Sequence, residues 1–405
     1  MAPEPDLNAP AVHGNPFETY RQLRESDPVH WSESFRGWCL YRHADVQTAL
    51  GHPAFSSKRL DTFRRLTPPD RAAQVAEVFE TLDRWVLFQD GEAHHRQRRL
   101  FGHGFAPGAI RLMLPRIESV ADELIRGLSG RPSFDAAAEF AIPFPVTVIA
   151  DLFAVKPEDR LRVQHWSDDL AYFLTSIPIP AEACDRIGPT LRDLETTMAA
   201  VVEARRGHSR GEFIDELIRA EEDRTVLETA DLMANFSVLL LAGNETTRNL
   251  IGNGIHLLLQ HPEVLAQLRS DEALWEKAVL EILRYRSPIQ IISRQVVAEV
   301  ELGGKRLKPG DQVFCMLGAA NHDPAVFPDP ERFDLRRANA SDHLAFGAGP
   351  HFCIGYALAL AEGRIALRRV FEAFPGLRAD PVRSAEFLPI TRLMGFTHLP
   401  VVKGA

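Results

Sequence analysis

Apolar residues recur at three- and four-residue spacing along most of the chain, and this pattern predicts a mainly helical protein. The predicted helices cover 17–25, 72–82, 92–100, 115–129, 145–153, 158–174, 190–205, 229–261, 271–286 and 354–374. Strands are predicted at 29–31 and 38–41 as a hairpin around Gly37, within 289–316, and on either side of Gly395. Pro107, Pro157 and the stretch 177–180 are expected to separate helices, and 323–333 to form a proline-rich coil.

The segment 229–261 predicts one unusually long helix. Thr229 is a suitable N-cap, Asp231 lies in the first turn, and His261 is followed by a proline that ends the pattern. About 32 residues at about 1.5 Å each give roughly 48 Å, enough to cross a whole domain. The chain has 405 residues but contains no repeat and no Gly/Ser-rich linker, so the sequence marks no boundary between separate domains.

Composition excludes several classes of protein. Hydrophobic residues make up 45% and charged residues 25%, which is typical of globular proteins and excludes disordered and fibrous chains. The net charge of -9 argues against nucleic acid as the main partner. The four cysteines form no C-x-x-C pair, and residues 1–6 are acidic and proline-rich without the apolar region of a signal peptide. No apolar run approaches the roughly 20 residues of a membrane span, so we expect a soluble protein of the reducing cytoplasm.

The most distinctive local feature is Phe346–Gly355, with the sequence FGAGPHFCIG, which we call the cysteine loop. Its glycines allow the backbone to turn tightly beside a flat ligand, and a helix is predicted to begin just after Cys353. A helix N-terminus favours the thiolate, which is the form of cysteine that binds metal. An isolated cysteine is more often a buried thiol in the core, so the flanking pattern decides between the two interpretations.

That pattern, Phe346-x-x-Gly349-x-His351-x-Cys353-x-Gly355, resembles the haem-binding loop of the cytochrome P450 superfamily. The resemblance implies that Cys353 is the axial thiolate of a non-covalent haem b, with Phe346 packed near it. It extends from about residue 15 to the C-terminus. It therefore implies the P450 fold, mainly α with a small β-rich lobe, as a single catalytic domain over 15–405 after a flexible lead at 1–14.

Two further segments resemble structural and catalytic signatures of the same family. Glu281 and Arg284 match the family's E-x-x-R helix, with Arg332 as the expected third member of a buried charge network that holds the scaffold of the cysteine loop. The stretch around Ala242 and Gly243 resembles the oxygen-binding signature. It implies that these two residues leave room beside the haem, that Thr246 positions dioxygen and that Glu245 relays protons. Without the cysteine loop, a packing glycine, a self-satisfied threonine and a solvated Glu245 would be the favoured explanation of the stretch.

Basic residues fall where the family binds the haem propionates and its electron donor. By resemblance, His94, Arg98, Arg294 and His351 contact the propionates, although a charged helix face is usually only solvated. A second set is predicted to form a docking face for an acidic ferredoxin or flavodoxin, which a reductase supplies with electrons from NAD(P)H: Arg96, Arg99, Arg364, Arg368 and Arg369.

The substrate pocket is predicted only by position in the family. Its expected walls are Trp85, Val86, Phe88, Leu239, Ala242, Gln290, Ile291, Arg392, Met394 and Phe396, together with the 171–181 loop. Most of these residues are apolar, which suits a hydrophobic small molecule, but each could instead belong to the core. Gln290 and Arg392 are the polar side chains that could orient a substrate.

The resemblance thus implies a bacterial-type monooxygenase that inserts one oxygen atom of O2 into a hydrophobic substrate, typically by C–H hydroxylation. Secondary, lipid, terpenoid or polyketide metabolism would supply such a substrate. A peroxide-driven peroxygenase is the alternative within the same chemistry, and a haem-binding sensor without turnover is the alternative outside it. The presence of both Glu245 and Thr246 argues against the peroxygenase.

Overall fold

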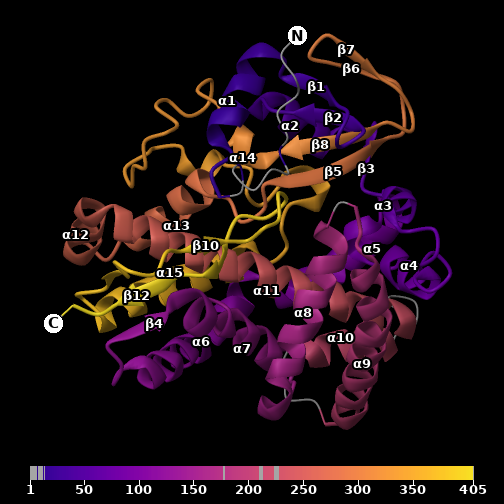
Figure 1. The fold of residues 1–405 in the computed structure, drawn as a ribbon. Helices are drawn as coiled ribbons and strands as arrows, with labels where there is room; N and C mark the ends of the chain where they lie inside the picture. The colour runs from indigo at the N-terminus through magenta and orange to yellow at the C-terminus, as the bar shows by residue number, and fades with distance from the viewer. Residues whose placement is uncertain are drawn as a thin grey trace. The chain divides into compact units, whose positions relative to one another are not determined.

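The apolar periodicity is realised as helices over most of the chain (Figure 1). The computed structural model describes residues 7, 12, 14–176, 178–208, 213–222 and 228–404. By their contacts the residues group into two units, one of 1–56, 121–142 and 246–405, the other of 57–120 and 143–245. Among the described residues, no helix combines the length and the apolar character needed to cross a bilayer.

The second unit, 57–120 and 143–245, is helical. Its elements are α3 (Leu60–Leu66), α4 (Ala76–Asp83), η1 (Val86–Phe88), α5 (Gly91–Gly104), α7 (Pro143–Leu152), η3 (Pro157–Asp159), α8 (Arg160–Thr175), α9 (Ala181–Arg205) and α10 (Phe213–Glu222). Helices α6 (Pro107–Leu128) and α11 (Thr229–Gln260) each begin in this unit and end in the other.

Pro107 separates two helices of this unit, as predicted. Helix α5 ends at Gly104, and Pro107 is the first residue of α6, where the N–H that proline lacks has no helical partner. Pro189 lies inside α9, which therefore starts nine residues before the predicted 190. Ile177, in the predicted 171–181 pocket loop, is outside the described residues.

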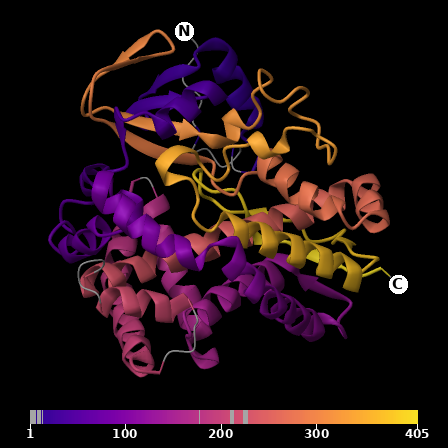
Figure 2. The same cartoon turned by 180° about the vertical axis from the view of Figure 1, so that it is seen from behind.

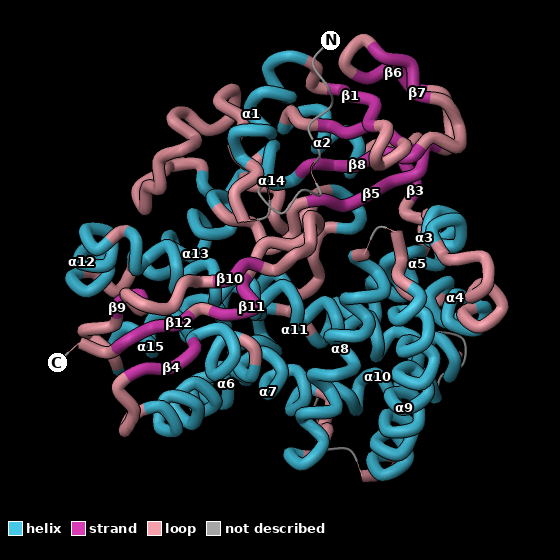
Figure 3. The backbone as a smooth tube through the Cα atoms, viewed as in Figure 1, coloured by secondary structure: helices cyan, strands magenta, loops and turns pink. Residues whose placement is uncertain are grey.

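The first unit contains the strands, which Figure 3 distinguishes from helices and loops. Five of them form one sheet in the order β1-β2-β8-β5-β3. These strands are β1 (Val29–Ser32), β2 (Gly37–Leu40), β3 (Phe55–Ser56), β5 (Ile291–Val296) and β8 (Gln312–Met316). The predicted hairpin is confirmed, with Trp31 opposite Trp38, whereas β2 pairs with β8 in parallel.

The smaller strands of this unit pair as β4-β12-β9, β10-β11 and β6-β7. They are β4 (Ser133–Asp135), β6 (Val300–Leu302), β7 (Lys305–Leu307), β9 (Arg378–Ala379), β10 (Glu386–Phe387), β11 (Phe396–His398) and β12 (Pro400–Val402). The helical elements are α1 (Phe17–Ser26), α2 (His43–Gly51), the π-helix η2 (Ala137–Ala141), α12 (Pro262–Ser270), α13 (Leu274–Tyr285), α14 (Leu317–Ala320), η4 (Ala340–Asp342), η5 (Gly349–His351) and α15 (Tyr356–Ala373).

Helices α13 and α15 lie side by side in this unit, as Figures 1 and 2 both show. The C-terminal half of α11 approaches both of them at a glycine. A Cβ on Gly254 would lie 2.7 Å from Leu367 Cδ1 on α15 and 3.3 Å from Ile282 Cδ1 on α13. The missing side chain thus lets the three helices pack closely, and α15 follows directly after the cysteine loop.

Most of the lead predicted at 1–14 lies outside the described residues. Two of its described residues are held in place: Leu7 is buried and its carbonyl accepts a hydrogen bond from Thr391 Oγ1 at 3.2 Å. The Gly14 carbonyl accepts one from Arg286 Nη1 at 3.0 Å.

Candidate functional site

The cysteine loop folds back on itself. The Cys353 N–H donates to the Phe346 carbonyl at 2.9 Å, and the Gly347 N–H donates to the Leu344 carbonyl at 2.8 Å. Gly347 and Gly349 have φ values of 71° and 68°, in the region that favours glycine. Cys353 is partly buried and lies two residues before Gly355, the N-cap of α15. The predicted position of this thiol at a helix N-terminus is therefore confirmed.

Three aromatic rings surround the loop. Phe346 lies 6.2 Å from both Phe352 and Tyr356, and the last two rings are 5.4 Å apart, measured between centroids. Phe346 is half-buried, whereas Phe352 and Tyr356 are exposed. The loop thus presents an aromatic surface beside the thiol.

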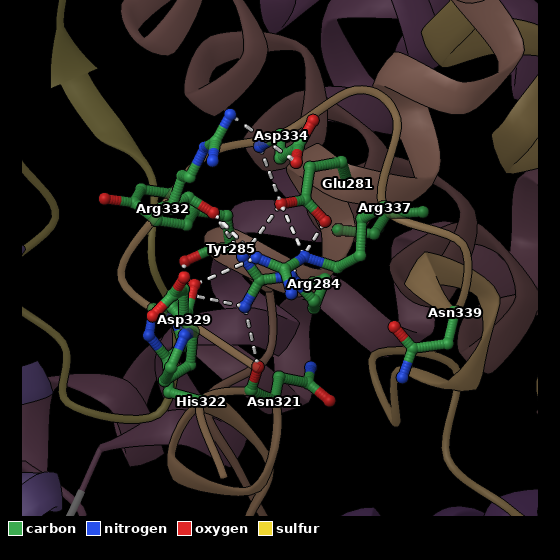
Figure 4. Close-up of polar contacts among 12 residues, drawn as sticks. Glu281, Arg284, Tyr285, Asn321, His322, Asp329, Arg332, Asp334, Arg337 and Asn339 are labelled. Atoms are coloured by element: carbon green, nitrogen blue, oxygen red, sulfur yellow. Dashed lines mark hydrogen bonds and ion pairs between the residues drawn. The ribbon is translucent and has the colours of Figure 1, made fainter. Parts of the chain in front are cut away.

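A buried charge network is centred on Glu281 and Arg284 (Figure 4). Arg284 and Glu281 have no exposed side-chain surface and make two hydrogen bonds of 2.8 Å. Arg284 also donates to the carbonyl of Asn321 at 2.9 Å. The Asn321 side-chain oxygen in turn accepts the Leu344 N–H at 2.7 Å, two residues before the loop begins. The network thus reaches the cysteine loop through one asparagine.

The third member of this network is Arg337, and the prediction of Arg332 was wrong. Arg337 Nε lies 3.2 Å from Glu281 Oε1 with only 7% of its side chain exposed, whereas the Arg332 side chain is 71% exposed and extends toward Asp334. Arg332 contributes only its carbonyl, which accepts from Arg284 and Arg337. Several arginines lie within six residues of one another in the sequence, and only the folded backbone shows which of them points toward Glu281.

Helix α11 carries the predicted oxygen-binding signature. Along this helix Ala242 is exposed and Gly243 and Thr246 are partly exposed, while Leu239, Asn244 and Leu250 are buried. The i, i+1, i+4 spacing places the three accessible positions on one helix face. Glu245, the predicted proton relay, is only 4% exposed.

The four predicted propionate contacts come from three elements. His94 and Arg98 lie on α5 of the second unit, one turn apart, with His94 buried and Arg98 half-buried. In the first unit, Arg294 is buried in β5 and His351 is half-buried in η5. Basic side chains of this kind form charge-assisted hydrogen bonds with carboxylates, so each unit by itself offers groups that suit an anion.

The predicted docking arginines differ in their availability. Arg96, Arg99 and Arg364 are exposed. Arg368 instead lies 2.8 Å from Glu272 and 3.6 Å from Glu372, and Arg369 lies 3.7 Å from Asp122. Because neighbouring carboxylates offset part of their charge, Arg368 and Arg369 attract an acidic partner less strongly than Arg96, Arg99 and Arg364 would.

Several predicted pocket walls belong to the core. A side chain that lines an open cavity retains exposed area, but Trp85 has none, and its indole N–H donates to Ser237 Oγ at 2.8 Å. Gln290 is 1% exposed and donates to the Ser287 carbonyl, and the Phe396 ring packs 4.8 Å from His256. For these three residues the core interpretation replaces the pocket interpretation.

The remaining pocket candidates divide by exposure. Ala242 is exposed and Val86 partly exposed, whereas five are buried: Phe88, Leu239, Ile291, Arg392 and Met394. The Arg392 guanidinium lies over the Phe314 ring at 5.8 Å, and burial lowers its pKa to about 10. Arg392 keeps its positive charge at neutral pH.

The residues present fit a haem. A haem would need one ligand from the protein besides the four nitrogens of its porphyrin, and Cys353 would supply that ligand from a glycine-turned loop. Within the first unit, the buried basic group of Arg294 suits a carboxylate such as a porphyrin carries. On α11 the small residue Ala242 keeps exposed surface, whereas Gly243 allows close packing, since a Cβ on it would lie 3.0 Å from Ile149 Cδ1.

Comparisons with known proteins agree with this chemistry. The family profile described as Cytochrome P450 matches residues 70–383. The chain is 34% identical to cytochrome P450 monooxygenase PikC of Streptomyces venezuelae over 96% of this chain and 91% of the relative. It is also 34% identical to 6-deoxyerythronolide B hydroxylase of Saccharopolyspora erythraea, over 99% of both chains.

A solved structure supports the fold. The crystal structure of CYP109E1 from Bacillus megaterium in complex with testosterone superposes with a TM-score of 0.86 at 29% identity, over 98% of this chain and 100% of that one. The mainly α fold with small sheets is therefore the P450 fold. The chain belongs to the cytochrome P450 family and is a haem-dependent monooxygenase that uses O2.

Proposed function

We propose that this enzyme hydroxylates a C–H bond of a hydrophobic small molecule, with Cys353 as the axial ligand of its haem and a separate ferredoxin or flavodoxin as its electron donor. The observation that carries the proposal is the cysteine loop, where two left-handed glycines and the Cys353-to-Phe346 hydrogen bond present a single thiol before α15. When bound, a thiolate-ligated haem supplies the reductive activation of dioxygen.

The chain's own residues hold the group and supply protons. The positive end of the α15 macrodipole favours the thiolate of Cys353, and four basic side chains bind the propionates: His94, Arg98, Arg294 and His351. Glu245 passes protons to the Thr246 hydroxyl, which lies on the accessible face of α11 beside Ala242 and Gly243. The adjacent acid and hydroxyl favour an O2-driven monooxygenase over a peroxide-driven enzyme.

The substrate is a bulky, weakly polar carbon skeleton of the polyketide or steroid kind. Two similar proteins support this class, since one is named as the hydroxylase of 6-deoxyerythronolide B and the other was solved with testosterone. Ala242 and Val86 are apolar candidates that keep exposed surface in the second unit. Arg392 in the first unit is the remaining charged candidate that could orient a polar substituent.

The electron donor is acidic and docks on Arg96, Arg99 and Arg364, drawing its electrons from NAD(P)H through a reductase. We place this reaction in the cytoplasm. Because α6 and α11 each run through both contact units, we propose that residues 15–405 act as one catalytic domain.

Two measurements test the proposal. A panel of macrolactones and steroids is screened for ligands that shift the Soret band, and a bound compound is then turned over with ferredoxin, reductase and NADPH. We expect hydroxylated product, and a Thr246→Ala variant that consumes NADPH but makes less product per electron pair. Equal coupling in Thr246→Ala, or efficient turnover with hydrogen peroxide in place of the redox chain, would contradict the proposed proton relay.

A further inference from the structure

The first residue of helix α2, His43, contacts the segment that precedes the cysteine loop. His43 is 6% exposed, and its Nε2 lies 2.9 Å from the carbonyl oxygen of Asp342, four residues before the loop begins. A carbonyl only accepts hydrogen bonds, so His43 Nε2 carries the proton and donates. The edge of the ring packs on Phe327 at 5.8 Å.

Asp323 holds this end of α2 in place. One oxygen of its carboxylate accepts the His43 N–H at 2.9 Å, and the other accepts the Ala325 N–H at 3.0 Å. Asp323 is only 5% exposed, and a carboxylate at a helix N-terminus also complements the helix dipole. The first turn of α2 is thereby fixed to the segment that follows Asn321.

The other end of α2 lies directly against Gly349 of the cysteine loop. A Cβ on Gly349 would be 2.8 Å from the Leu50 carbonyl oxygen and 2.9 Å from Gly51 Cα, both backbone atoms that cannot turn aside. The buried residues of α2 share one apolar cluster with Leu344 and Ala348. The loop therefore rests on the helix backbone itself.

We infer that α2 is a second positioning element for Cys353, beside the Glu281–Arg284 network, and that His43 is a positioning residue within it. The charge network is hydrogen-bonded to the backbone near the cysteine loop at Leu344. Helix α2 contacts the same stretch of backbone on both sides of Leu344, at Asp342 and at Gly349. Three fixed points define the path of a short loop, and a ligand held this way loses less freedom when it binds metal.

The inference depends on the proposed ligation of haem by Cys353, and its test uses the holoenzyme. His43→Phe keeps a ring against Phe327 but removes the donor to Asp342, while His43→Gln keeps an N–H that can donate. Gln47→Ala, on the exposed face of the same helix, is the matched control. Two quantities are measured for each variant. The first comes from the carbon monoxide spectrum of the reduced protein and is the intensity of the band of haem that has lost its thiolate ligand, divided by the intensity of the band of thiolate-ligated haem. The second is the reduction potential of the haem.

Loss of one buried hydrogen bond should raise that ratio about five- to tenfold in His43→Phe and shift the potential. We expect His43→Gln to return both quantities toward the wild type and Gln47→Ala to leave them unchanged. If His43→Phe does not retain haem, Asp323→Asn is measured instead and should show a smaller change in the same direction.

The inference would be overturned if the spectrum and reduction potential of His43→Phe, or of Asp323→Asn in its place, matched those of Gln47→Ala. The role of the His43 hydrogen bond would also be refuted if His43→Gln behaved like His43→Phe. A wild-type protein without the thiolate band would instead refute the assignment of Cys353, so the two failures are distinguishable.

Discussion

Arg284 shows how much one buried side chain can do at the scale of single residues. Its guanidinium neutralises Glu281 and donates to three carbonyls in two later segments, one at Asn321 and the other at Pro330 and Arg332. The sequence predicted the Glu281–Arg284 pair through its resemblance to the family's E-x-x-R helix, whose i, i+3 spacing places both residues on one face. It did not predict Arg337, because no local spacing relates that residue to Glu281 across 56 positions.

The correction from Arg332 to Arg337 can be tested directly. Arg337→Ala removes a nearly buried partner of a fully buried carboxylate, and we expect it to lower the free energy of unfolding by about 3 kcal/mol. Arg332→Ala removes an exposed side chain and should change it by less than about 0.5 kcal/mol. Urea denaturation of the two variants would contradict the assignment if their losses were equal.

Glu362 gives a prediction about pH. It lies on α15 with 2% exposure, its Oε2 has no hydrogen-bond partner among the described residues, and burial raises the pKa of its carboxyl well above 4.5. The folded protein therefore keeps a proton that the unfolded chain releases above pH 4.5. Stability due to this group is complete below that pH and falls as the pH rises toward the folded-state pKa, by at most about 1.4 kcal/mol per unit.

Glu362→Gln keeps the size of the side chain and removes the titration. We expect the variant to gain stability relative to the wild type as the pH increases from 4.5 to 8, measured by urea denaturation at each pH. A stability difference that does not change with pH would show that Glu362 is ionised in the folded protein.

At the scale of elements, a helix was predicted correctly when the residues that define its ends lie within its own segment. Helix α11 was predicted within one residue because its cap, its length and the proline after it all lie within the segment. Helix α2 was missed, since it is short and its N-terminus is fixed by Asp323, 280 residues away. Helix α12 was missed because Pro262 reads as the end of one helix and is also the first residue of the next.

Two glycines of α11 allow the effect of packing on stability to be distinguished from the effect of helix propensity. Gly254→Ala would place a methyl group 2.7 Å from Leu367, whereas Gly252→Ala would place one in ordinary contact, 3.5 Å from Phe396. Both changes gain about 0.5–1 kcal/mol of helix propensity. We therefore expect Gly252→Ala to be neutral or stabilising and Gly254→Ala to cost a net 1–2 kcal/mol, roughly, through overpacking. Equal melting temperatures would refute the close contact of α11 with α15.

At the scale of the whole molecule, the family and the fold could be predicted from motifs spread along the chain, but the pocket could not. Ala242 was predicted correctly as accessible because small residues in a long helix are a local signal. Trp85, Gln290 and Phe396 were not, since whether an apolar or amide side chain faces a cavity or the core depends on distant partners such as Ser237 and His256.

The docking proposal also concerns the whole molecule, since an acidic protein binds an acidic partner only through a local basic patch. Arg364→Glu should slow reduction by ferredoxin about tenfold at low ionic strength, with a smaller effect at high salt. Arg378→Glu reverses an equally exposed charge on β9 and is the control. Stopped-flow rates that fall equally in both variants would attribute the effect to net charge and not to a docking face.

The most direct test of the account is the carbon monoxide spectrum of the reduced, haem-loaded protein, recorded for the wild type and for Cys353→His. We predict that the wild type shows the red-shifted band produced by a sulfur ligand opposite the gas, and that the variant binds haem but lacks this band. A wild-type spectrum without the band, or a variant that retains it, would contradict the assignment of Cys353 as the axial ligand.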